Sequence, residues 1–549
     1  MHYRKIASAA VAFALSSSAF SQKIDNKTWY QQDPATDSVY GISLKKAYDF
    51  LKDKKSKPVI VAVIDGGIDT THEDLRSVLW TNPKEIPGNH RDDDKNGYVD
   101  DMHGWNFLGN ANVHNVNKEA EEKYRVYYKF KNQFANKVLD TSTLSKVDKY
   151  EYLSWKRAAA ELTDPAKSAQ DAQMAFGLGR MYAMMHPADS ILQKAMGKPD
   201  YTLGELEKYT TASDTVSRAK YAFLNIKRLV PSFTDETANT EIMSGLESER
   251  DKYQKATSAR EKAPVPYRQE IVMDDYNDFK DNRYGNADVY GADPMHGTHV
   301  SGIIAAARNN GIGIDGIADN VKILSVRAVP DGDEYDKDIA LAIRYAVDNG
   351  AKVINMSFGK PFSPEKYWVD SAFVYAQQHD VLLVHAAGNE SQDIDTVQSF
   401  PNGDLIFCPG RRATNLITVG ASGDPHIDEK NLAASFSNYG KNSVDVFAPG
   451  VKIYSAVPKG NKYAYLSGTS MASPVVAGIA ALIRSYYPRL SAEQVKYAIC
   501  HSVVKPEKFT KLPGADTPVP FEDLSVSGGI VNAYNALKLA STMKPEKAK

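Results

Sequence analysis

Cysteine is scarce in this sequence of 549 residues, which contains only Cys408 and Cys500. Two cysteines exclude a disulfide framework and a cysteine-based metal cluster, whereas one disulfide stays possible because sequence does not show whether the two approach each other. Neither sign of charge is in excess, since 66 lysines and arginines face 68 aspartates and glutamates, a net charge of −2. This balance gives no electrostatic reason to expect nucleic acid or an anionic membrane surface as a partner.

Long apolar runs are also missing beyond the first residues. Two basic residues, Arg4 and Lys5, precede an almost wholly apolar stretch at 6–15, and small residues precede a cut ahead of Gln22. This pattern is typical of a secretory signal peptide at residues 1–21. The alternative, a short hydrophobic helix of the mature protein, is disfavoured because the run is too short to span a bilayer. We expect a secreted or periplasmic protein without a membrane anchor.

Several short runs rich in β-branched residues lack strict alternation of apolar and polar side chains. Such runs are typical of strands that are buried on both faces, as in a parallel sheet. Helical patterns lie between them, for example at 336–349, where Gly350 provides the stop. Strand and helix in repetition predict an α/β fold with a doubly wound, mostly parallel sheet. The runs are 59–64, 321–329, 353–356, 381–384, 416–419 and 444–447.

The stretch at 117–263 has a different pattern. It holds long charged and aromatic helical segments at 119–137, 149–162, 166–184 and 241–259. Because strand patterns stand on both sides, we interpret it as a mostly helical insertion into an α/β domain made of 58–116 and 264–543. We expect its charges to be solvated helix faces. An N-terminal segment at 22–57 and a basic tail at 544–549 complete the chain.

Two segments carry candidate chemistry before residue 300. The first predicted strand ends in Asp65 and two glycines, and a carboxylate there lies where open α/β sheets place their sites, although a structural helix cap gives the same pattern. The segment HGTHVSG begins at His296 and opens an apolar helix. Metal binding by His296 and His299 is disfavoured, since the metalloprotease pattern needs an i, i+4 spacing with Glu between. We predict one histidine for proton transfer and one packed, hydrogen-bonded neighbour.

A third segment, SGTSMASPVVAG, contains Ser470 at the expected start of a buried helix with a proline in its first turn. The Ser470 backbone N–H and the positive end of the helix dipole then meet at one point, so this residue can supply both a nucleophile and an oxyanion donor. The esterase pattern Gly-x-Ser-x-Gly fails because Ala472 stands where its second glycine belongs.

Together these segments resemble the subtilisin-like serine proteases, or subtilases. The resemblance rests on VIDGGID at Asp65, HGTHVSG at His296, AAGNE ending at Glu390 and SGTSMASP at Ser470, and covers about 57–115 and 282–539. The order Asp, His, Ser is that of subtilisin. The resemblance implies a serine endopeptidase that hydrolyses protein or peptide substrates through an acyl-enzyme and needs no cofactor for catalysis.

Chemistry and resemblance assign the same catalytic roles. Ser470 is the predicted nucleophile, His296 its general base, and Asp65 the group that orients the imidazole and stabilises its protonated form. Asn389 is predicted to donate its side-chain amide to the oxyanion, the alternative being a simple turn residue. A catalytically silent binding protein on a subtilase scaffold is the alternative function, disfavoured because all four residues are present.

The resemblance also implies two segments that border the substrate. Phe358 stands where leucine is more usual, which leaves the pocket size open. An acidic run at 331–338 follows another strand that is expected to border the substrate. This run would either recognise basic residues of the substrate or form a solvated loop, and we favour the solvated loop. The predicted substrate-binding residues are Ser357, Phe358, Gly359, Ala386, Ala387 and Gly388.

Residues 92–101 predict a structural calcium site. Oxygen ligands at alternate positions and a glycine at the sixth reproduce the start of a calcium loop, but His103 replaces the final glutamate and the flanks are not helical, so it is no EF-hand. So many carboxylates in one turn repel one another without a cation. Asp74 resembles a calcium ligand of some subtilases. The predicted ligands are Asp92, Asp94, Asn96, Tyr98 through its carbonyl, and Asp100.

Two expectations concern the whole chain. We expect a monomer, and the 22–57 segment is too short for the inhibitory propeptide domain that is common in the family. The insertion leads back into His296, so it is expected near the active-site rim, where it restricts long substrates, aids folding or is a surface elaboration.

Overall fold

The computed structural model describes residues 27–230, 233–235, 237–406, 411–427 and 431–546. The predicted signal peptide and Cys408 lie outside the described residues, as does the end of the basic tail.

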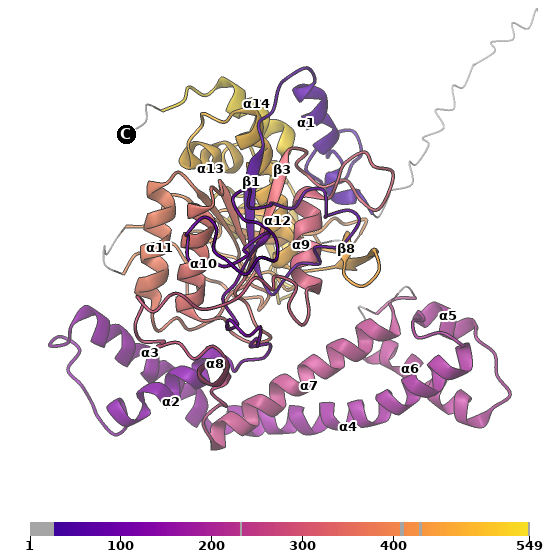
Figure 1. Cartoon of the computed structure of the whole chain (residues 1–549). Coiled ribbons are helices and arrows are strands. Elements are labelled where there is room, and N and C mark those ends of the chain that lie inside the picture. Colours follow the sequence, from indigo (N-terminus) through magenta and orange to yellow (C-terminus); the bar gives the residue numbers. More distant parts are fainter. Residues whose placement is uncertain (1–26, 231–232, 236, 407–410, 428–430, 547–549) are drawn as a thin grey trace, which may run out of the picture.

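Seven strands of the described chain form one sheet at the centre of the molecule (Figure 1). Their order is β2-β3-β1-β4-β5-β6-β7, and every neighbouring pair is parallel. The predicted α/β class with a mostly parallel sheet is confirmed. The strands are β1 (Val59–Asp65), β2 (Gly104–Asn106), β3 (Val321–Arg327), β4 (Val353–Met356), β5 (Leu382–Ala386), β6 (Leu416–Ser422) and β7 (Val446–Pro449).

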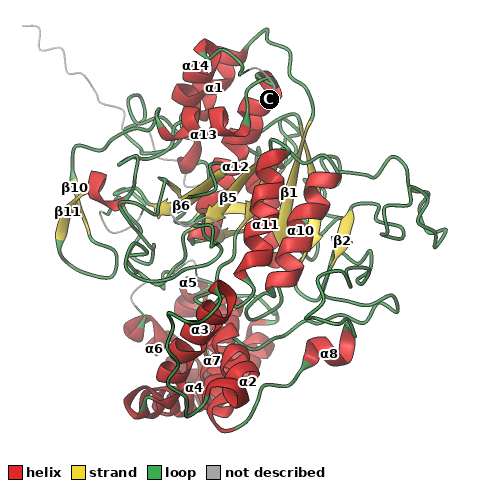
Figure 2. Cartoon of the chain, turned by 90° about the vertical axis from the view of Figure 1, so that its left-hand side faces the viewer, coloured by secondary structure: helices red, strands yellow, loops and turns green. Residues whose placement is uncertain are grey.

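Helices cover both faces of this sheet, which explains why its strands are apolar on both sides. Helices α10 (Asp336–Asp348) and α11 (Lys366–Gln378) lie side by side over one face (Figure 2). Helices α9 (Met295–Ala305) and α12 (Thr469–Tyr486) pack on the other face. All of α12 except Ser470 and Tyr486 is buried. Each large apolar side chain buried there stabilises the fold by about 1.5–3 kcal/mol.

The described part of the N-terminal segment belongs to the core. Trp29 and Tyr30 are fully buried, and the Trp29 indole Nε1 donates to the Val451 carbonyl at 3.2 Å. Helix α1 packs against α14, and α14 also contacts α13. The smaller elements here and at the carboxyl end are η1 (Trp29–Gln31), α1 (Leu44–Leu51), β8 (Ile453–Val457), β9 (Lys462–Leu466), α13 (Ala492–Cys500), β10 (Phe509–Lys511), β11 (Pro518–Pro520), η2 (Phe521–Leu524) and α14 (Ala533–Thr542).

Between β2 and α9 the described chain forms helices and no strand of the sheet. Figure 1 shows two parts: α2, α3 and α8 lie beside the α/β domain, and α4 to α7 project from them as an elongated arm. The arm has its own apolar cluster, which includes Leu192, Tyr201 and Phe223. The helices are α2 (Glu122–Phe134), α3 (Lys146–Thr163), α4 (Pro165–Met196), α5 (Leu203–Lys208), α6 (Asp214–Leu229), α7 (Asn239–Glu261) and α8 (Tyr267–Ile271).

Local signals set the ends of the longest helix, α4. The Asp164 side chain accepts from the Ala166 backbone N–H, and Pro165 occupies the first helical position, where its missing N–H costs nothing. Gly197 follows the last turn with φ +70°, the left-handed conformation that favours glycine at a helix end. The helix therefore runs twelve residues beyond the predicted end at residue 184, to Met196.

Candidate active site

Asp65 and His296 form a close pair at the carboxyl end of β1. His296 is the second residue of α9, and its Nδ1 lies 2.9 Å from each carboxylate oxygen of Asp65. The Gly66 backbone N–H donates to Asp65 Oδ1 at 2.8 Å and helps to fix the carboxylate. Gly297 permits this approach, because a Cβ there would stand 2.2 Å from the Gly67 carbonyl oxygen.

The environment of His296 adjusts its basicity. Desolvation lowers the pKa of His296, but the charge and hydrogen bond of Asp65 raise it by more, so the pKa lies above its ordinary value. His299 is different: its Nε2 lies 3.0 Å from the Ile453 carbonyl, and full burial lowers its pKa to about 3. His299 is thus a packed, hydrogen-bonded histidine, as the sequence predicts for one of the two, whereas the proton-transfer role of His296 stays a prediction.

Ser470 lies in the first turn of α12 beside the end of β4. Its hydroxyl donates to the Ser357 carbonyl at 3.1 Å, and the Ser357 hydroxyl donates to the Ser470 carbonyl at 3.0 Å. The helix begins at Thr469, one residue earlier than predicted, and Pro474 falls in its second turn rather than its first. Pro474 has no N–H for the Ser470 carbonyl, and the Ser357 hydroxyl supplies the missing donor.

The sheet register brings the two pairs together. Ile64 of β1 is directly opposite Met356 of β4, and the next residues are Asp65 and Ser357. The Asp65–His296 pair and the Ser357–Ser470 contacts therefore lie at the ends of neighbouring parallel strands, where open α/β sheets place their sites. Among the described residues no hydrogen bond joins Ser470 Oγ to His296, and catalytic hydrogen bonds often form only in the complex with substrate.

Asn389 is held in one orientation by Thr469. The Thr469 backbone N–H and hydroxyl both donate to Asn389 Oδ1 at 2.9 Å. The oxygen thus accepts from Thr469, and no hydrogen bond from Asn389 Nδ2 is present among the described residues, so this amide group is an available donor. Gly388 is tied to the same residue, since its N–H donates to Thr469 Oγ1 at 3.1 Å.

Polar groups that the sequence did not reveal hold the end of β4 in place. Ser473 Oγ donates to Asn355 Oδ1 at 2.8 Å, and Asn355 Nδ2 donates to Ser357 Oγ at 2.9 Å. His385 Nε2 lies 2.8 Å from the Phe358 carbonyl, and burial lowers the pKa of His385 to about 4, so the neutral ring donates there. No motif marks these residues, because each acts through a contact with a distant part of the chain.

A cleft of about 920 Å³ begins at Ser470 and Asn389. Its lining includes the predicted substrate-binding residues Ser357, Phe358, Gly359, Ala386 and Gly388. Ala387 is not part of the lining and is buried in the apolar core. The insertion also contributes to the lining, through Lys123, Tyr150, Leu153, Ser154, Arg157, Glu161 and Lys167. The insertion thus borders the same cleft as Ser470.

The expectation of a solvated acidic loop at 331–338 is wrong. Asp331 is exposed, but Glu334, Asp336 and Asp338 are buried. Asp338 pairs with Arg268 and accepts from the Tyr284 hydroxyl at 2.6 Å. Arg268 and Lys360, from other parts of the chain, are the ion-pair partners of Asp338 and Asp336, and a local sequence pattern does not show such partners.

The expectation of solvated charges on the insertion is wrong for the first turn of α2. Glu122 is 3% exposed and pairs with Arg125 at 2.6 Å and with Lys360 at 2.7 Å. Lys360 directly follows Gly359 and also lies 2.9 Å from Asp336. This buried network joins the insertion to the segment that borders the cleft.

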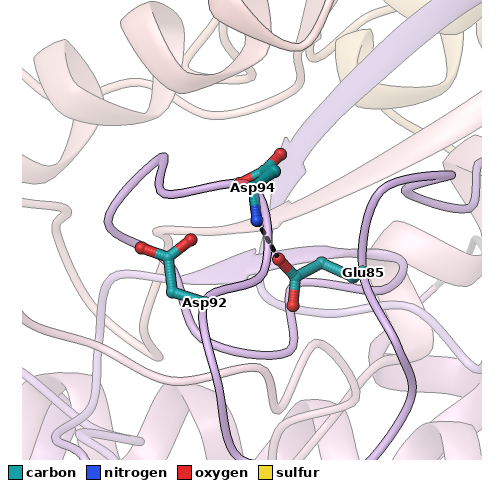
Figure 3. Close-up of side chains that lie close together, drawn as sticks. All are labelled: Glu85, Asp92 and Asp94. Carbon is teal, nitrogen blue, oxygen red and sulfur yellow. Dashed lines mark hydrogen bonds between the residues drawn. The ribbon is translucent and has the colours of Figure 1, made fainter.

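Three carboxylates gather at the predicted calcium loop (Figure 3). Oxygens of Glu85, Asp92 and Asp94 lie within 4.8 Å of one another. Glu85 stands outside the loop pattern at 92–101, so that pattern does not predict it as a ligand. Asp100 is not in this group: its Oδ2 accepts from the His90 N–H at 2.9 Å, and its buried Oδ1 has no partner among the described residues.

Asn96, Tyr98 and Asp74 make protein contacts of their own. Asn96 Oδ1 accepts from the Tyr98 N–H at 2.7 Å, and the Tyr98 ring packs on Trp105 at 5.1 Å. Asp74 accepts from Asn310 Nδ2 at 2.6 Å and from the Tyr463 hydroxyl at 3.0 Å. Protein donors therefore satisfy Asp74, which in this chain is a structural carboxylate.

Comparisons with known proteins identify the family to which a chain with this parallel sheet belongs. The model of the subtilase family (Peptidase_S8) matches residues 56–520. The chain therefore belongs to the subtilase family, a family of serine-type endopeptidases.

Individual relatives match a smaller part of the chain. The thermophilic serine proteinase of Bacillus sp. (strain AK1) is 46% identical over 209 residues, which are 38% of this chain and 46% of that protein. Subtilisin DY of Bacillus licheniformis is 40% identical over 204 residues, 37% of this chain and 67% of that protein. The match thus spans about half the length of the first relative and two thirds of the second.

One of the similar solved structures is a protease from Pseudoalteromonas arctica PAMC 21717. It has a TM-score of 0.37 and 27% identity, and covers 47% of this chain and 80% of that chain. None of the described helices has the length and apolar character that a membrane span requires.

Proposed function

We propose that this chain is a secreted serine endopeptidase that hydrolyses peptide bonds of proteins through Asp65, His296 and Ser470. The observation that supports the proposal is the sheet register, because Asp65, which contacts His296, and Ser357, which contacts Ser470, each follow one of two paired residues of neighbouring strands. Membership of the subtilase family supports the same reaction.

In the proposed acylation step, the Ser470 side chain rotates from the Ser357 carbonyl toward His296. Ser470 Oγ attacks the peptide carbonyl carbon, and the hydroxyl proton moves to His296 Nε2. Asp65 keeps the Nδ1 proton of His296 in place and stabilises the imidazolium. The tetrahedral intermediate collapses when His296 returns the proton to the leaving amine. Water then repeats the sequence to release the acyl group and restore the Ser470 hydroxyl.

Two donors are proposed for the oxyanion. The N–H groups of the first helical turn have no intrahelical partners, so the Ser470 N–H is available together with the positive end of the α12 dipole. Asn389 is the second donor, because Thr469 occupies its Oδ1 and leaves its Nδ2 group for the substrate. Such donors stabilise charge that develops only in the transition state.

The segments at 357–359 and 386–388 are proposed to bind the extended substrate backbone. Backbone hydrogen bonds give affinity that does not depend on side chains, so this mode suits an enzyme that accepts many sequences. His385 and Asn355 support the proposal, because their contacts with the Phe358 carbonyl and the Ser357 hydroxyl keep this segment in one position.

A structural calcium ion is proposed at the acidic cluster. The donor set fits a hard cation, since Glu85, Asp92 and Asp94 offer carboxylate oxygens from one small volume. The unpartnered buried Oδ1 of Asp100 is a further oxygen in the same loop. An ion held there would neutralise the loop and stabilise the fold, and it has no part in the proposed chemistry.

The chain is further proposed to act as a monomer outside the cytoplasm after loss of residues 1–21. The pattern of basic, apolar and small residues at its start supports export.

A fluorophosphonate probe tests the proposed function, because it labels only an activated serine. The purified chain should be labelled and should hydrolyse a peptide library, and Ser470→Ala should lose both properties while retaining its melting temperature. Ser467→Ala is the matched control, since Ser467 lies on the exposed part of the same segment. An unlabelled, inactive parent protein would instead support a silent binding protein on this scaffold.

A further inference from the structure

We propose that Arg157 of the insertion binds a carboxylate of the peptide substrate, so that the enzyme prefers acidic segments. This inference rests on the proposed endopeptidase function and names a substrate class for it.

Arg157 belongs to the wall that the insertion adds to the cleft. It lies on α3 and lines the cleft together with Phe358, Gly359 and Ser470. The guanidinium packs over the ring of Phe362 at 3.9 Å, and its Nη2 donates to the Pro361 carbonyl. Both contacts fix the side chain against the segment that follows Gly359, so its position is set before a substrate arrives.

Every other cation of the cleft lining has a carboxylate partner. Lys123 lies 2.6 Å from Glu121, Lys167 lies 3.1 Å from Glu161, and Lys360 lies 2.7 Å from Glu122. In the part of the chain that the structure describes, no carboxylate oxygen lies within 4.0 Å of a nitrogen of Arg157.

The charge of Arg157 is partly desolvated and has no ion-pair partner among the described residues. Its Nε is buried without a hydrogen-bond partner there, and desolvation lowers the pKa of the guanidinium by more than the nearby Tyr150 and Glu161 raise it. A partly buried cation without an ion-pair partner is costly, and a bound carboxylate reduces the cost by a charge-assisted hydrogen bond. The planar guanidinium offers two parallel donors to a carboxylate, which an ammonium group does not.

The anions of the cleft indicate where on the substrate this carboxylate lies. Glu161 is paired with Lys167, whereas Glu390 is exposed and accepts from Asn438 Nδ2 at 2.6 Å. Glu390 follows Asn389, so it stands at the side of the cleft that holds the proposed oxyanion donor. A substrate carboxylate is therefore favoured at the positions that reach Pro361 and α3, and disfavoured at those that reach Glu390.

The test uses the full-length chain and fluorogenic peptides that differ only by Glu, Gln or Lys at one position, scanned over the four residues before the cut. At one position the parent protein should show a kcat/KM about tenfold higher for Glu than for Gln, equivalent to ~1.4 kcal/mol. Each peptide is made with a free and with an amidated carboxyl terminus, which separates recognition of a side chain from recognition of a chain end.

Arg157→Met keeps the apolar contact with Phe362 and removes the charge, and it should bring the Glu to Gln ratio to about one while hydrolysis of the Gln peptide persists. The matched control is Lys156→Met, which removes the same charge from the exposed face of α3 outside the cleft and should leave the ratio unchanged.

Two outcomes overturn the inference. One is a parent protein that cleaves the peptides with no Glu preference at any position and with either terminus, a measurement that does not depend on the folding of a variant. The other is a preference that survives in Arg157→Met or that falls equally in Lys156→Met. If no peptide is cleaved and Ser470 is not labelled, the proposed function itself fails.

Discussion

Glu122 of the insertion and Lys360 of the α/β domain form a buried ion pair, with 2.7 Å between Oε2 and Nζ. Lys360 is the residue after Gly359, and its backbone N–H and carbonyl pair with Phe400, each at 2.9 Å. The insertion is thus attached to the segment that we propose to bind substrate. A surface elaboration that hangs freely from the fold would have no such buried contact.

Glu122→Gln should destabilise the protein by about 3 kcal/mol, because it leaves two buried cations, Lys360 and Arg125, with less negative charge. Desolvation raises the pKa of Glu122, but these two cations lower it by more, so its stabilising charge is present above its ordinary pKa and is lost as the pH falls below it. The substitution should therefore lower the free energy of unfolding more near neutral pH than in acid.

Denaturant unfolding at several pH values measures this effect. Glu249→Gln is the control, since its pair with Lys252 is solvent-exposed and should contribute less than about 0.5 kcal/mol. Equal stability of Glu122→Gln and the parent protein at neutral pH would show that the pair does not hold the insertion in place.

Asp65→Asn should change the pH profile of kcat/KM as well as its maximum. Only the neutral imidazole accepts a proton, and Asp65 raises the pKa of His296, so activity in the parent should rise through a midpoint above 6.5. Without the carboxylate charge, desolvation dominates and the midpoint should move to lower pH. The maximum should fall by about 10⁴-fold, because the tautomer is no longer held.

The control for this profile is Asp293→Asn. Asp293 is exposed and also raises the pKa of His296, although less than Asp65 does, so its loss should move the midpoint slightly in the same direction at nearly full activity. A midpoint that stays in place in Asp65→Asn would contradict the proposed role of the Asp65–His296 pair.

Asn389→Ala should lower kcat by about 10²–10³-fold with little change in KM, the loss typical of one oxyanion donor. Gln392→Ala removes another exposed amide from the lining of the same cleft and should change kcat less than about twofold. Steady-state kinetics with one peptide substrate compares both. An unaltered kcat in Asn389→Ala would remove the oxyanion assignment and leave the acyl-enzyme mechanism intact.

The fold was accessible from sequence because its signals are local. The strand at 353–356 has its predicted bounds, and α10 ends at Asp348, one residue before the predicted end. A strand that is buried on both faces of the sheet is an uninterrupted apolar run in the sequence. In a helix that packs on the sheet, apolar residues recur every three to four positions. Asp65 ends a strand, and His296 and Ser470 lie in the first turns of helices, so their motifs also predict their positions within these elements.

The contacts of the insertion were not accessible in this way. Glu122 and Lys360 are 238 residues apart, and each looks like an ordinary solvated charge within its own helix or loop. Burial of a charge depends on a partner that the topology supplies, and no periodicity records that partner. The same reason explains why the sequence pattern predicts a solvated position for Asp336, whose partner Lys360 lies in another segment. The sequence pattern also marks neither Arg157 nor Glu85, because each joins its site only through contacts with other segments of the chain.

Calcium should raise the melting temperature of the parent protein relative to a chelator, because an ion bound only by the folded state stabilises by RT ln(1 + [L]/Kd), about 2.7 kcal/mol at a hundredfold excess over Kd. Asp94→Ala and Glu85→Gln should each abolish the difference, since both residues belong to the carboxylate cluster. Asp516→Ala removes an acid whose side chain is 93% exposed, and it should leave the difference in melting temperature unchanged. Magnesium in place of calcium should have a weaker effect, because the crowded carboxylates suit a larger cation with flexible coordination. Equal melting temperatures of the parent with calcium and with chelator would exclude a structural ion at this loop, and the close carboxylates would then be held by the protein's own donors, such as the Asp93 and Asp94 N–H groups that donate to Glu85.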